Sequence, residues 1–436
     1  MRAEDNEYLT RIGPGTPMGA LMRCYWLPVA KSSELEAGGA PVRMRILGEN
    51  LLGFRTPEGA VGLIDHRCKH RCASLAYGRN EEGGIRCIYH GWKFDVTGQC
   101  IDMPSEPDES EFSARVRIPA AAVIEKFGLV WAYLGSQRPA PPFPLFDLDQ
   151  VPEDQIEITF LHRACNWLQG LEGDIDTVHV GFLHLGGIDA QNFEKGSTNY
   201  YRQSNLTPHY EAIDTPYGAI SSAYRPAGEG QLYHRVAQIL FPSFTMAPQD
   251  PLGYVKLRCW LPLDDENSML VIIDGPRPPT QAVDKEGKKL PGFFGDGDML
   301  PHDGGWLGRY RLKQCLANNH MQSRELMKTL NYSGIMGGRV QDQAVVESMG
   351  PIADRTYETL GSSDRMIART RRRLLKAARE LAEQGASPPG AADASLYRSI
   401  RSGFITLPET TDWLAIFNEK RREWHGGPVA DLERTR

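Results

Sequence analysis

Short runs in which apolar and polar residues alternate fill the first third of the chain. The run at 42–48 (VRMRILG) has apolar side chains at every second position, whereas 129–135 (LVWAYLG) is almost continuously apolar. Alternation bounded by glycine predicts half-buried antiparallel strands, and a short unbroken apolar run predicts a more deeply buried strand. The pattern therefore predicts a small β domain over residues 26–145, after an N-terminal segment 1–25 that opens with a short helix. The proline-rich stretch 139–144 cannot continue a sheet and closes this domain.

A second region, 146–385, combines strands with helices. The runs 233–240 and 255–261 alternate as half-buried strands do, and a helix is expected from the cap at Ser363–Asp364 to Gln384, ending at Gly385. Between these strands and this helix lies the stretch 276–305, which is rich in residues that interrupt helices and strands. It is either a flap over a site or a plain surface loop. Residues 386–436 show too little pattern to predict elements and are taken as a C-terminal tail. The fold class expected is α+β.

Charge and composition exclude several classes of protein. The chain has 436 residues and a net charge of −6, which argues against binding to a nucleic-acid backbone. No apolar run approaches the ~20 residues that a membrane span needs, and the N-terminus does not resemble a secretory signal. We therefore expect a cytoplasmic protein with no nucleic-acid or membrane partner. The arginine-rich run 369–373 is interpreted as the solvated face of a helix.

Four of the eight cysteines cluster between residues 68 and 100. Cys68-x-His70 and Cys87-x-x-His90 each offer one thiolate and one imidazole, with sixteen residues between the two motifs. One of each per loop matches a Rieske [2Fe-2S] centre, in which two cysteines hold one iron and two histidines hold the other. The alternative is a Cys2His2 zinc site, but such modules usually pair cysteine with cysteine and histidine with histidine.

A second candidate metal site lies in the stretch 166–184, which contains Asp176, His179 and His184. Two histidines with one carboxylate are the usual ligands of mononuclear iron(II) that reacts with dioxygen. On an ideal helix the two histidines would be about 140° apart, so the helix must bend or end between them, and Gly181 is a plausible place. The carboxylate must come from elsewhere in the chain. Its candidates are Asp342, Glu347 and Asp354.

Several further motifs make the chain resemble the oxygenase (alpha) components of Rieske non-haem iron oxygenases, and within them the phthalate-dioxygenase-like branch. These motifs are 4–6 (EDN), 13–19 (GPGTPMG), 89–95 (YHGWKFD), 98–100 (GQC), 103–107 (MPSEP) and 341–351 (QDQAVVESMGP). The resemblance implies an all-β Rieske domain followed by a helix-grip catalytic domain, an antiparallel sheet with helices. It also implies that His179, His184 and Asp342 bind the mononuclear iron, and that Cys68, His70, Cys87 and His90 bind the cluster.

The resemblance also implies a role for Asp176 between subunits. In such oxygenases a head-to-tail trimer sets the cluster of one subunit beside the iron of the next. Asp176 would accept hydrogen bonds from His179 and from His90 of the neighbouring subunit, and so serve as the bridge for electron transfer. The disulfide of respiratory Rieske proteins cannot form, because Tyr89 occupies the position of its second cysteine. Cys72 and Cys100 are therefore expected to be buried thiols.

The function implied is that of a terminal oxygenase, fed with electrons by an NAD(P)H-dependent reductase for which flavin and ferredoxin are the candidate carriers. Its cofactors would be the Rieske 2Fe-2S cluster and mononuclear non-haem Fe(II). Its assembly would be a homotrimer or a hexamer built from two trimers. Phthalate-type cis-dihydroxylation of a carboxylated aromatic substrate is favoured. The alternatives are an O-demethylase or monooxygenase on an aromatic acid and, from a different class, a non-catalytic Rieske electron-transfer protein.

Basic residues in the strand-rich region are candidates for binding a substrate carboxylate. Arg202, Arg225, His234 and Arg235 all lie there, and a guanidinium pairs with a carboxylate through two parallel hydrogen bonds. Because side chains alternate along a strand, only one of His234 and Arg235 can point inward. Arg202 and Arg235 are the two taken forward as substrate-binding residues.

Overall fold

The structure, a computed structural model, describes residues 1–107, 112–276, 283–293, 295 and 297–434. Two short helices open the chain, α1 (Ala3–Thr10) and α2 (Pro17–Met22), where one was expected. Helix α2 starts at a proline, and the Thr16 hydroxyl accepts a hydrogen bond from the Gly19 amide at 3.1 Å. None of the helices in the described residues is long and apolar enough to span a membrane.

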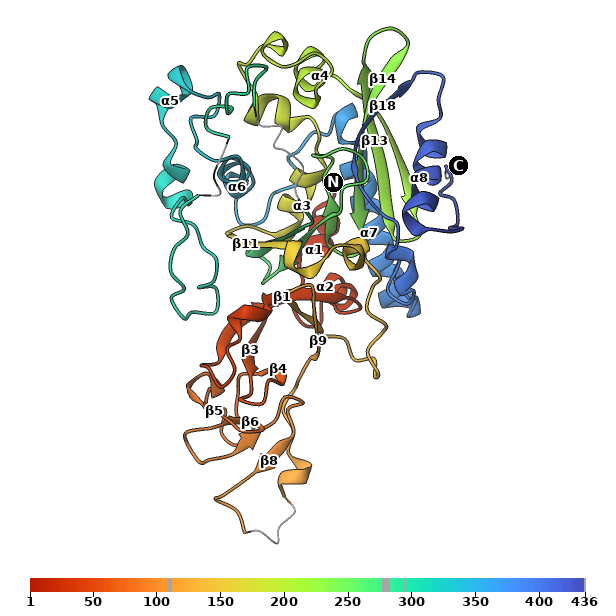
Figure 1. Ribbon diagram of the computed structural model, residues 1–436. Helices are drawn as coiled ribbons and strands as arrows, with labels where there is room; N and C mark the ends of the chain where they lie inside the picture. The colour runs from red at the N-terminus through yellow and green to blue at the C-terminus, as the bar shows by residue number, and fades with distance from the viewer. Residues whose placement is uncertain (108–111, 277–282, 294, 296, 435–436) are drawn as a thin grey trace.

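Small antiparallel sheets follow, as the alternating pattern predicted. One sheet has the order β1-β10-β9, the second β2-β3-β4 and the third β5-β6-β7-β8. In Figure 1 this part of the chain, red to orange, extends away from the rest of the molecule, with β5, β6 and β8 toward its far end. The bounds are β1 (Trp26–Lys31), β2 (Val42–Ile46), β3 (Glu49–Arg55), β4 (Val61–Asp65), β5 (Arg79–Glu81), β6 (Gly84–Arg86), β7 (Lys93–Phe94), β8 (Cys100–Asp102), β9 (Ala122–Lys126) and β10 (Leu129–Tyr133).

Two hydrophobic cores divide this region. A small core around Leu52, Phe54 and Phe94 includes both Cys68 and Cys87. The sheet that contains β10 instead packs into the main core of the molecule, where the Trp131 ring stacks on Phe244 with centroids 6.3 Å apart. The sheet β1-β10-β9 of the first domain is thus packed on the second domain. The two cysteine loops pack in a separate, small core.

The second domain is built on a large antiparallel sheet with the order β11-β17-β16-β15-β14-β13-β12. Strand β14 also pairs with β18, which comes from the segment that the sequence pattern left without elements. The tail 386–436 is therefore part of this sheet, and it ends with a helix, α8 (Trp413–His425). The bounds are β11 (Glu157–Arg163), β12 (His209–Thr215), β13 (Gly218–Pro226), β14 (Gln231–Leu240), β15 (Phe244–Met246), β16 (Lys256–Pro262), β17 (Ser268–Asp274) and β18 (Gly403–Pro408).

Helices cover this sheet and carry the candidate site. Helix α3 (Trp167–Ile175) packs on β15 and β16, and α7 (Arg365–Gln384) packs on β12 and β13. Helix α6 (Gly338–Ser348) lies against α3, beside the sheet in Figure 1. Two shorter helices, α4 (Thr198–Ser204) and α5 (Arg324–Thr329), lie in the connections.

Helix α7 confirms one prediction and corrects another. It ends at Gly385, whose φ of +67° is the left-handed conformation that glycine adopts readily. The arginine-rich run on this helix is not a solvated face: Arg371 is buried and pairs with Glu172 and Glu358, and Arg369 pairs with Asp214. Of the run, only Arg372 is an exposed arginine.

The breaker-rich stretch 276–305 is irregular, as predicted, with 277–282, 294 and 296 outside the described residues. Phe293 and Gly295 line the large cavity of the second domain, and the Phe293 ring lies 5.6 Å from the His184 ring, centroid to centroid. The part of this stretch around Phe293 therefore borders the site.

Candidate functional site

The two cysteine motifs meet at one end of the β domain. Cys68 and Cys87 are 1% and 3% exposed, and the His70 and His90 rings lie 4.4 Å apart between centroids. Burial and the neighbouring Cys87 thiol raise the pKa of the Cys68 thiol. Two buried thiols beside two imidazoles form a donor set that suits a metal cluster.

The imidazole orientation fits the same interpretation. His70 stacks on Trp92 at 4.5 Å, and its Nδ1 is buried without a hydrogen-bond partner among the described residues. A buried ring nitrogen with no partner is costly unless a ligand supplies one. The four residues therefore fit a [2Fe-2S] cluster held by two thiolates and two imidazoles.

The remaining cysteines nearby have different surroundings. Cys100 is buried, as expected, but Cys72 is exposed, contrary to the expectation for it. Cys72 has a φ of +60°, in a tight turn where its amide donates to the Cys68 carbonyl at 2.9 Å. This turn holds the side chain away from the small core. All eight cysteines are free thiols, so no disulfide ties the two loops together.

His179 and His184 lie on a π-helical turn that follows α3. Helix α3 ends at Ile175, before both histidines, and the turn η7 (Val180–His184) contains a hydrogen bond from the Leu185 amide to the Val180 carbonyl at 3.1 Å. The helical path is therefore widened between the two histidines, in a turn that contains Gly181, and it does not end there. A bond that spans five residues widens the turn, so that residues five apart come to the same side. The two rings face each other with centroids 5.2 Å apart.

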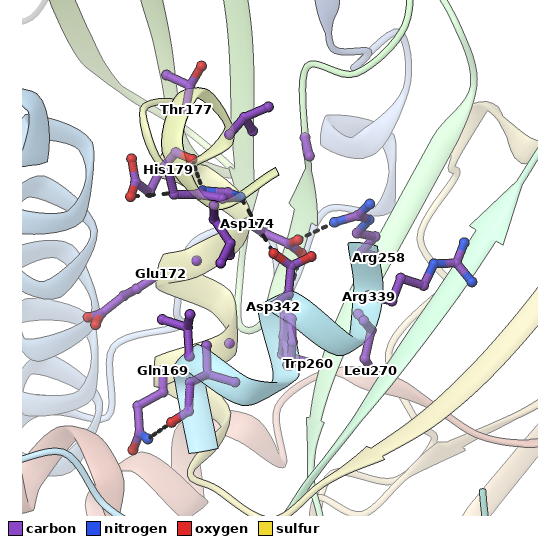
Figure 2. A pocket seen from close by; sticks show the side chains of 18 of the residues that line it. Gln169, Glu172, Asp174, Thr177, His179, Arg258, Trp260, Leu270, Arg339 and Asp342 are labelled. Carbon is purple, nitrogen blue, oxygen red and sulfur yellow. Dashed lines mark hydrogen bonds and ion pairs between the residues drawn. The ribbon is translucent and has the colours of Figure 1, made fainter. Parts of the chain in front are cut away.

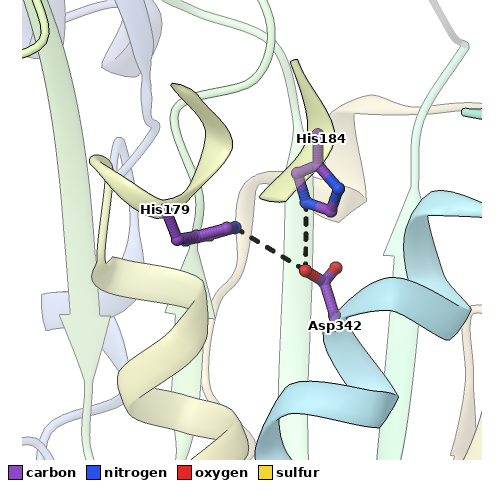
Figure 3. A group of neighbouring side chains, drawn as sticks. All are labelled: His179, His184 and Asp342. Atoms are coloured by element: carbon purple, nitrogen blue, oxygen red, sulfur yellow. Dashed lines mark ion pairs between the residues drawn. The ribbon is translucent and has the colours of Figure 1, made fainter. Parts of the chain in front are cut away.

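Asp342 on α6 is the carboxylate that the fold brings to these histidines. Its Oδ1 lies 3.0 Å from His184 Nε2 and 3.6 Å from His179 Nε2 (Figure 3). One ligand atom from each of the three residues lies within 4.8 Å of the others. Although burial raises the pKa of the Asp342 carboxyl, the two imidazoles outweigh it and lower that pKa well below its ordinary value. Two imidazole nitrogens and one carboxylate on one side fit a mononuclear iron(II) with open positions.

The other two carboxylate candidates serve different purposes. Glu347 accepts hydrogen bonds from His320 Nε2 at 2.7 Å and from the Ala164 amide at 2.9 Å. Asp354 accepts hydrogen bonds from the Thr356 amide and hydroxyl. Neither belongs to the cluster of three that could hold a metal ion.

A cavity of about 980 Å³ opens beside the three residues, between α3, α6 and the sheet. Its volume is at the upper end of what a small-molecule site needs. Figure 2 shows Asp174 and Asp342 near its centre, with Arg258 beside Asp174. The Asp174 carboxylate accepts hydrogen bonds from Arg258, from Trp260 Nε1 at 2.7 Å and from the Thr245 hydroxyl at 2.7 Å. Asp174 thus fixes α3 to the sheet.

Glu172, two residues earlier on α3, points away from the iron site. Its carboxylate pairs with Arg371 at 2.5 Å and with Arg355 at 3.1 Å, and all three side chains are buried. Burial raises the pKa of Glu172, but the two guanidinium groups outweigh it and lower that pKa. Glu172 therefore joins α3 to α7, and its charge is satisfied within the protein.

Of the four basic candidates, Arg202 and Arg235 line the cavity. Arg235 is 2% exposed, and its Nε and Nη1 have no hydrogen-bond partner among the described residues. Arg202 donates to Asn199 at 3.1 Å, but its Nε is likewise unpartnered. Burial lowers the pKa of Arg202 to about 10, so it stays charged at neutral pH.

His234 and Arg225 do not line the cavity. The Nδ1 of His234 lies 2.9 Å from the Ser222 hydroxyl, and Arg225 donates to the Asn205 carbonyl at 2.7 Å. As alternation along β14 requires, only Arg235 of the adjacent pair His234 and Arg235 reaches the cavity.

Asp176 lies at the C-terminal end of α3, at the cavity wall. Its carboxylate accepts a hydrogen bond from the Val178 amide at 2.8 Å. The His179 ring uses the main chain instead of this carboxylate: Nδ1 lies 2.6 Å from the Asp176 carbonyl oxygen and 3.9 Å from Oδ2. The side chain is 29% exposed, so it is only partly buried.

Several residues that position the site were not found from the sequence. Gln169 on α3 donates to the Val346 and Gly350 carbonyls at 2.8 and 3.0 Å, and Arg163 on β11 donates to Gln343 at 3.2 Å. These contacts fix α6 against α3 and the sheet. Gln341, beside Asp342, lies 2.7 Å from His184 Nδ1. In the sequence, the one feature that pointed to Gln341 was its position directly before Asp342, the expected iron ligand.

Family models match both parts of the chain. Residues 25–120 match the family model for the Rieske [2Fe-2S] domain, and residues 132–434 match the model described as "LigXa C-terminal domain like". The second match alone covers more than half of the chain. The two models together account for both domains described above.

Whole-chain relatives extend the similarity. The chain is 42% identical to a 3-chlorobenzoate-3,4-dioxygenase oxygenase subunit of Comamonas testosteroni, over 96% of this chain and 98% of that protein. It is 34% identical to a phthalate 4,5-dioxygenase oxygenase subunit of Pseudomonas putida, over 94% and 93%. A crystal structure of dicamba monooxygenase shares the fold, with a TM-score of 0.55 at 18% identity, over 84% of this chain and 100% of that one.

Proposed function

This chain belongs to the Rieske non-haem iron oxygenases as an oxygenase component, and from that membership we propose that it hydroxylates an aromatic carboxylic acid. Cis-dihydroxylation of the ring, with dioxygen and electrons from a reductase, is the favoured reaction. The observation that carries the substrate class is the pair of buried guanidinium groups, Arg202 and Arg235, at one cavity. Two of the relatives described above are named for reactions of aromatic acids.

The charge of the cavity wall supports an anionic substrate. Most buried charges there are matched, such as Arg258 with Asp174 and Glu172 with Arg371. Arg202 and Arg235 instead form no ion pair among the described residues, and each keeps a nitrogen atom without a hydrogen-bond partner. A buried cation without a counter-charge costs several kcal/mol, which a bound carboxylate would offset. These two residues would therefore bind and orient the acid group of the substrate.

The chain would hold its two metal groups with separate residue sets. His179, His184 and Asp342 would hold the iron, and Cys68, His70, Cys87 and His90 would hold the cluster. When bound, the cluster supplies electrons one at a time and the iron supplies open positions for dioxygen. The apolar wall formed by Val180, Leu270 and Ile272 would pack on the aromatic ring and exclude water from it.

Asp176 is proposed to connect the two sites across a subunit boundary. Its carboxylate lies beside His179 and is partly exposed, which suits a hydrogen bond from His90 of a neighbouring subunit. In Figure 1 the strands β5, β6 and β8, toward the cluster end, lie far from α3 and α6 of the same chain. A trimer, alone or paired as a hexamer, would bring the two kinds of site together.

The remaining partners follow from the chemistry. The oxygenase component would receive electrons from an NAD(P)H-dependent reductase, directly or through flavin and ferredoxin carriers. Because such a reductase draws on NAD(P)H, the protein would work in the cytoplasm.

Product analysis tests this function. The protein, with a compatible reductase, would be given benzoate, 3-chlorobenzoate, phthalate and a methoxybenzoate under ¹⁸O₂. Cis-dihydroxylation is expected to add both atoms of one dioxygen to the ring, whereas O-demethylation of the methoxybenzoate would release formaldehyde instead. If no aromatic acid in the set is oxidised and none stimulates oxygen uptake, the proposed substrate class is wrong.

An uncharged ligand of similar shape provides the matched control for the proposed carboxylate contact. Arg235→Ala is expected to weaken benzoate binding by about tenfold or more, the loss of a charge-assisted contact of roughly 1.4 kcal/mol. Benzamide has nearly the same shape without the charge, so its weaker binding should not change. Equal losses for the two ligands, or no loss for benzoate, would remove Arg235 as the anchor.

A further inference from the structure

Gln341 touches the candidate iron site without being one of its proposed ligands. Its side chain is 1% exposed, and its Oε1 lies 2.7 Å from His184 Nδ1. The amide nitrogen of the same side chain donates to the Ile335 carbonyl at 2.8 Å and to the Gly292 carbonyl at 3.4 Å. Both ends of the Gln341 amide thus have partners.

These partners fix which way the amide faces. If the amide were reversed, its oxygen would face two carbonyl oxygens, and none of the three groups has a proton to donate. The oxygen of Gln341 must therefore face His184, and because it can only accept, His184 Nδ1 must carry the proton. The lone pair of the His184 ring is then on Nε2, the atom 3.0 Å from Asp342 Oδ1.

His179 obtains the same arrangement from the main chain. Its Nδ1 lies 2.6 Å from the Asp176 carbonyl oxygen, which is also purely an acceptor, and its Nε2 faces Asp342. Both rings therefore present Nε2 to the carboxylate. No side-chain substitution can remove the carbonyl that orients His179, whereas the orientation of His184 depends on Gln341.

We propose that Gln341 is a positioning residue that keeps His184 in the tautomer with Nε2 free to bind iron. This inference rests on the ligand set His179, His184 and Asp342 proposed above. Gln341 also joins two chain segments to the site, since Gly292 and Ile335 accept from its amide nitrogen. Ligating histidines generally depend on such an acceptor for ring orientation and for donor strength.

The test is a Co(II) titration of the full chain with its cluster in place and the mononuclear site emptied by a chelator. Gln341→Leu removes the acceptor and is expected to weaken Co(II) binding by about 10- to 100-fold. Gln341→Glu, protonated at this buried position, keeps an oxygen that accepts from His184 and a hydroxyl that can donate to the Ile335 carbonyl, and should keep the affinity within about threefold of the unaltered protein. The visible spectrum of the cluster reports that each variant is folded.

Gln343→Leu is the matched control. Gln343 lies on the same helix and is also buried, but it contacts Arg163 and the Gln314 carbonyl instead of a proposed ligand. Its substitution should cost stability but weaken Co(II) binding much less than Gln341→Leu does. If Gln343→Leu weakens Co(II) binding as much as Gln341→Leu does, the effect is a general loosening of α6 and the proposal fails.

Asp342→Ala separates a failure of this inference from a failure of the ligand set. If Asp342→Ala retains full Co(II) affinity, the proposed iron site itself is wrong. If Asp342→Ala loses binding while Gln341→Leu binds like the unaltered protein, the ligand set stands and the role of Gln341 is overturned. Equal weakening in Gln341→Leu and Gln341→Glu would also overturn it, because the acceptor would then not be the cause.

Discussion

Charge pairing separates the residues that hold the second domain together from those that face a ligand. Asp174 and Glu172 on α3 both end in buried ion pairs, with Arg258 and with Arg371 respectively. Arg202 and Arg235 at the same cavity keep nitrogen atoms without partners. Since buried charges are normally matched, the unmatched pair indicates that this cavity suits a negatively charged ligand.

Asp176→Asn tests the bridge between subunits. Asparagine can still accept from the Val178 amide, and the main-chain contact to His179 is unaffected, so both metal sites should stay loaded. Single-turnover product formation should fall by about tenfold or more, because a neutral amide would replace the carboxylate that is proposed to accept from His90 of the neighbouring subunit. Rapid-quench measurement on protein with a pre-reduced cluster checks this. An unchanged rate would show that Asp176 is not the bridge.

The ligands differ in how far the sequence could identify them. Cys68, His70, Cys87 and His90 lie in two compact motifs, so their local spacing predicts that they share a site. Asp342 could not be chosen by spacing over Glu347 and Asp354, because sequence separation does not give distance in a folded chain. The resemblance to a family selected it, and the distance of 3.0 Å to His184 agrees. Gln341 was missed because hydrogen bonds to carbonyls of distant segments leave no sequence pattern.

Helix α3 depends on a close approach to the sheet at Gly170. A Cβ added there would lie 2.0 Å from the Trp260 ring, and Trp260 in turn donates to Asp174. Gly170→Ala should therefore lower the free energy of unfolding by about 1–3 kcal/mol through overpacking. It should also weaken Co(II) binding, because α3 leads directly into the histidine turn. Urea denaturation and the Co(II) titration measure the two effects.

Gly173→Ala on the same helix is the control for this change. A Cβ at Gly173 would meet the Val346 side chain at 3.7 Å, an ordinary contact. Alanine is favoured over glycine inside a helix by up to about 1 kcal/mol, so this variant should be as stable as the unaltered protein or more so. Equal destabilisation by both substitutions would show that the Trp260 contact is not the cause.

The pairing of α3 with α7 should depend on pH. The folded pKa of Glu172 is lowered from 4.5, because Arg355 and Arg371 outweigh the effect of its burial. Its contribution to stability is thus complete above about pH 4.5 and is lost as the pH falls through the lower folded pKa. Glu172→Gln should cost roughly 3 kcal/mol at pH 7, and the difference from the unaltered protein should shrink below about pH 4.5.

Urea denaturation of both proteins between pH 7 and pH 3.5 measures that difference. Glu380→Gln on α7 is the control, because among the described residues the Glu380 side chain pairs only with exposed Lys376, and it should cost less than about 0.5 kcal/mol. A constant difference between Glu172→Gln and the unaltered protein across this range would contradict the linkage.

The sequence predicted those elements whose ends or faces are marked by a local residue pattern. The stop of α7 at Gly385 was predicted because a left-handed glycine ends helices. The π turn at 180–184 and the pairing of β18 with β14 were not, because each depends on contacts outside the local sequence. Strand β18 pairs Phe404 with Arg235, which lies far earlier in the chain. Its residues show no clean alternation, since β18 lies only partly buried.

The two metal sites lie in different parts of the molecule, and this makes assembly part of the proposed chemistry. The cysteine loops belong to the small core of the first domain, whereas the three-residue iron site lies in the second. A verified monomer should therefore retain both metal groups yet turn over at least tenfold more slowly than the assembled protein. Activity measured against mass-determined oligomer size tests this. Full activity in a monomer would exclude transfer between subunits.

The count of iron and acid-labile sulfide per chain tests the central claim most directly. The account predicts about three irons and about two sulfides in the loaded protein, two irons in the cluster and one at His179, His184 and Asp342. Asp342→Ala should contain about two irons with its sulfide unchanged. A loaded protein with only about two irons, or an Asp342→Ala variant that keeps about three, would contradict the account.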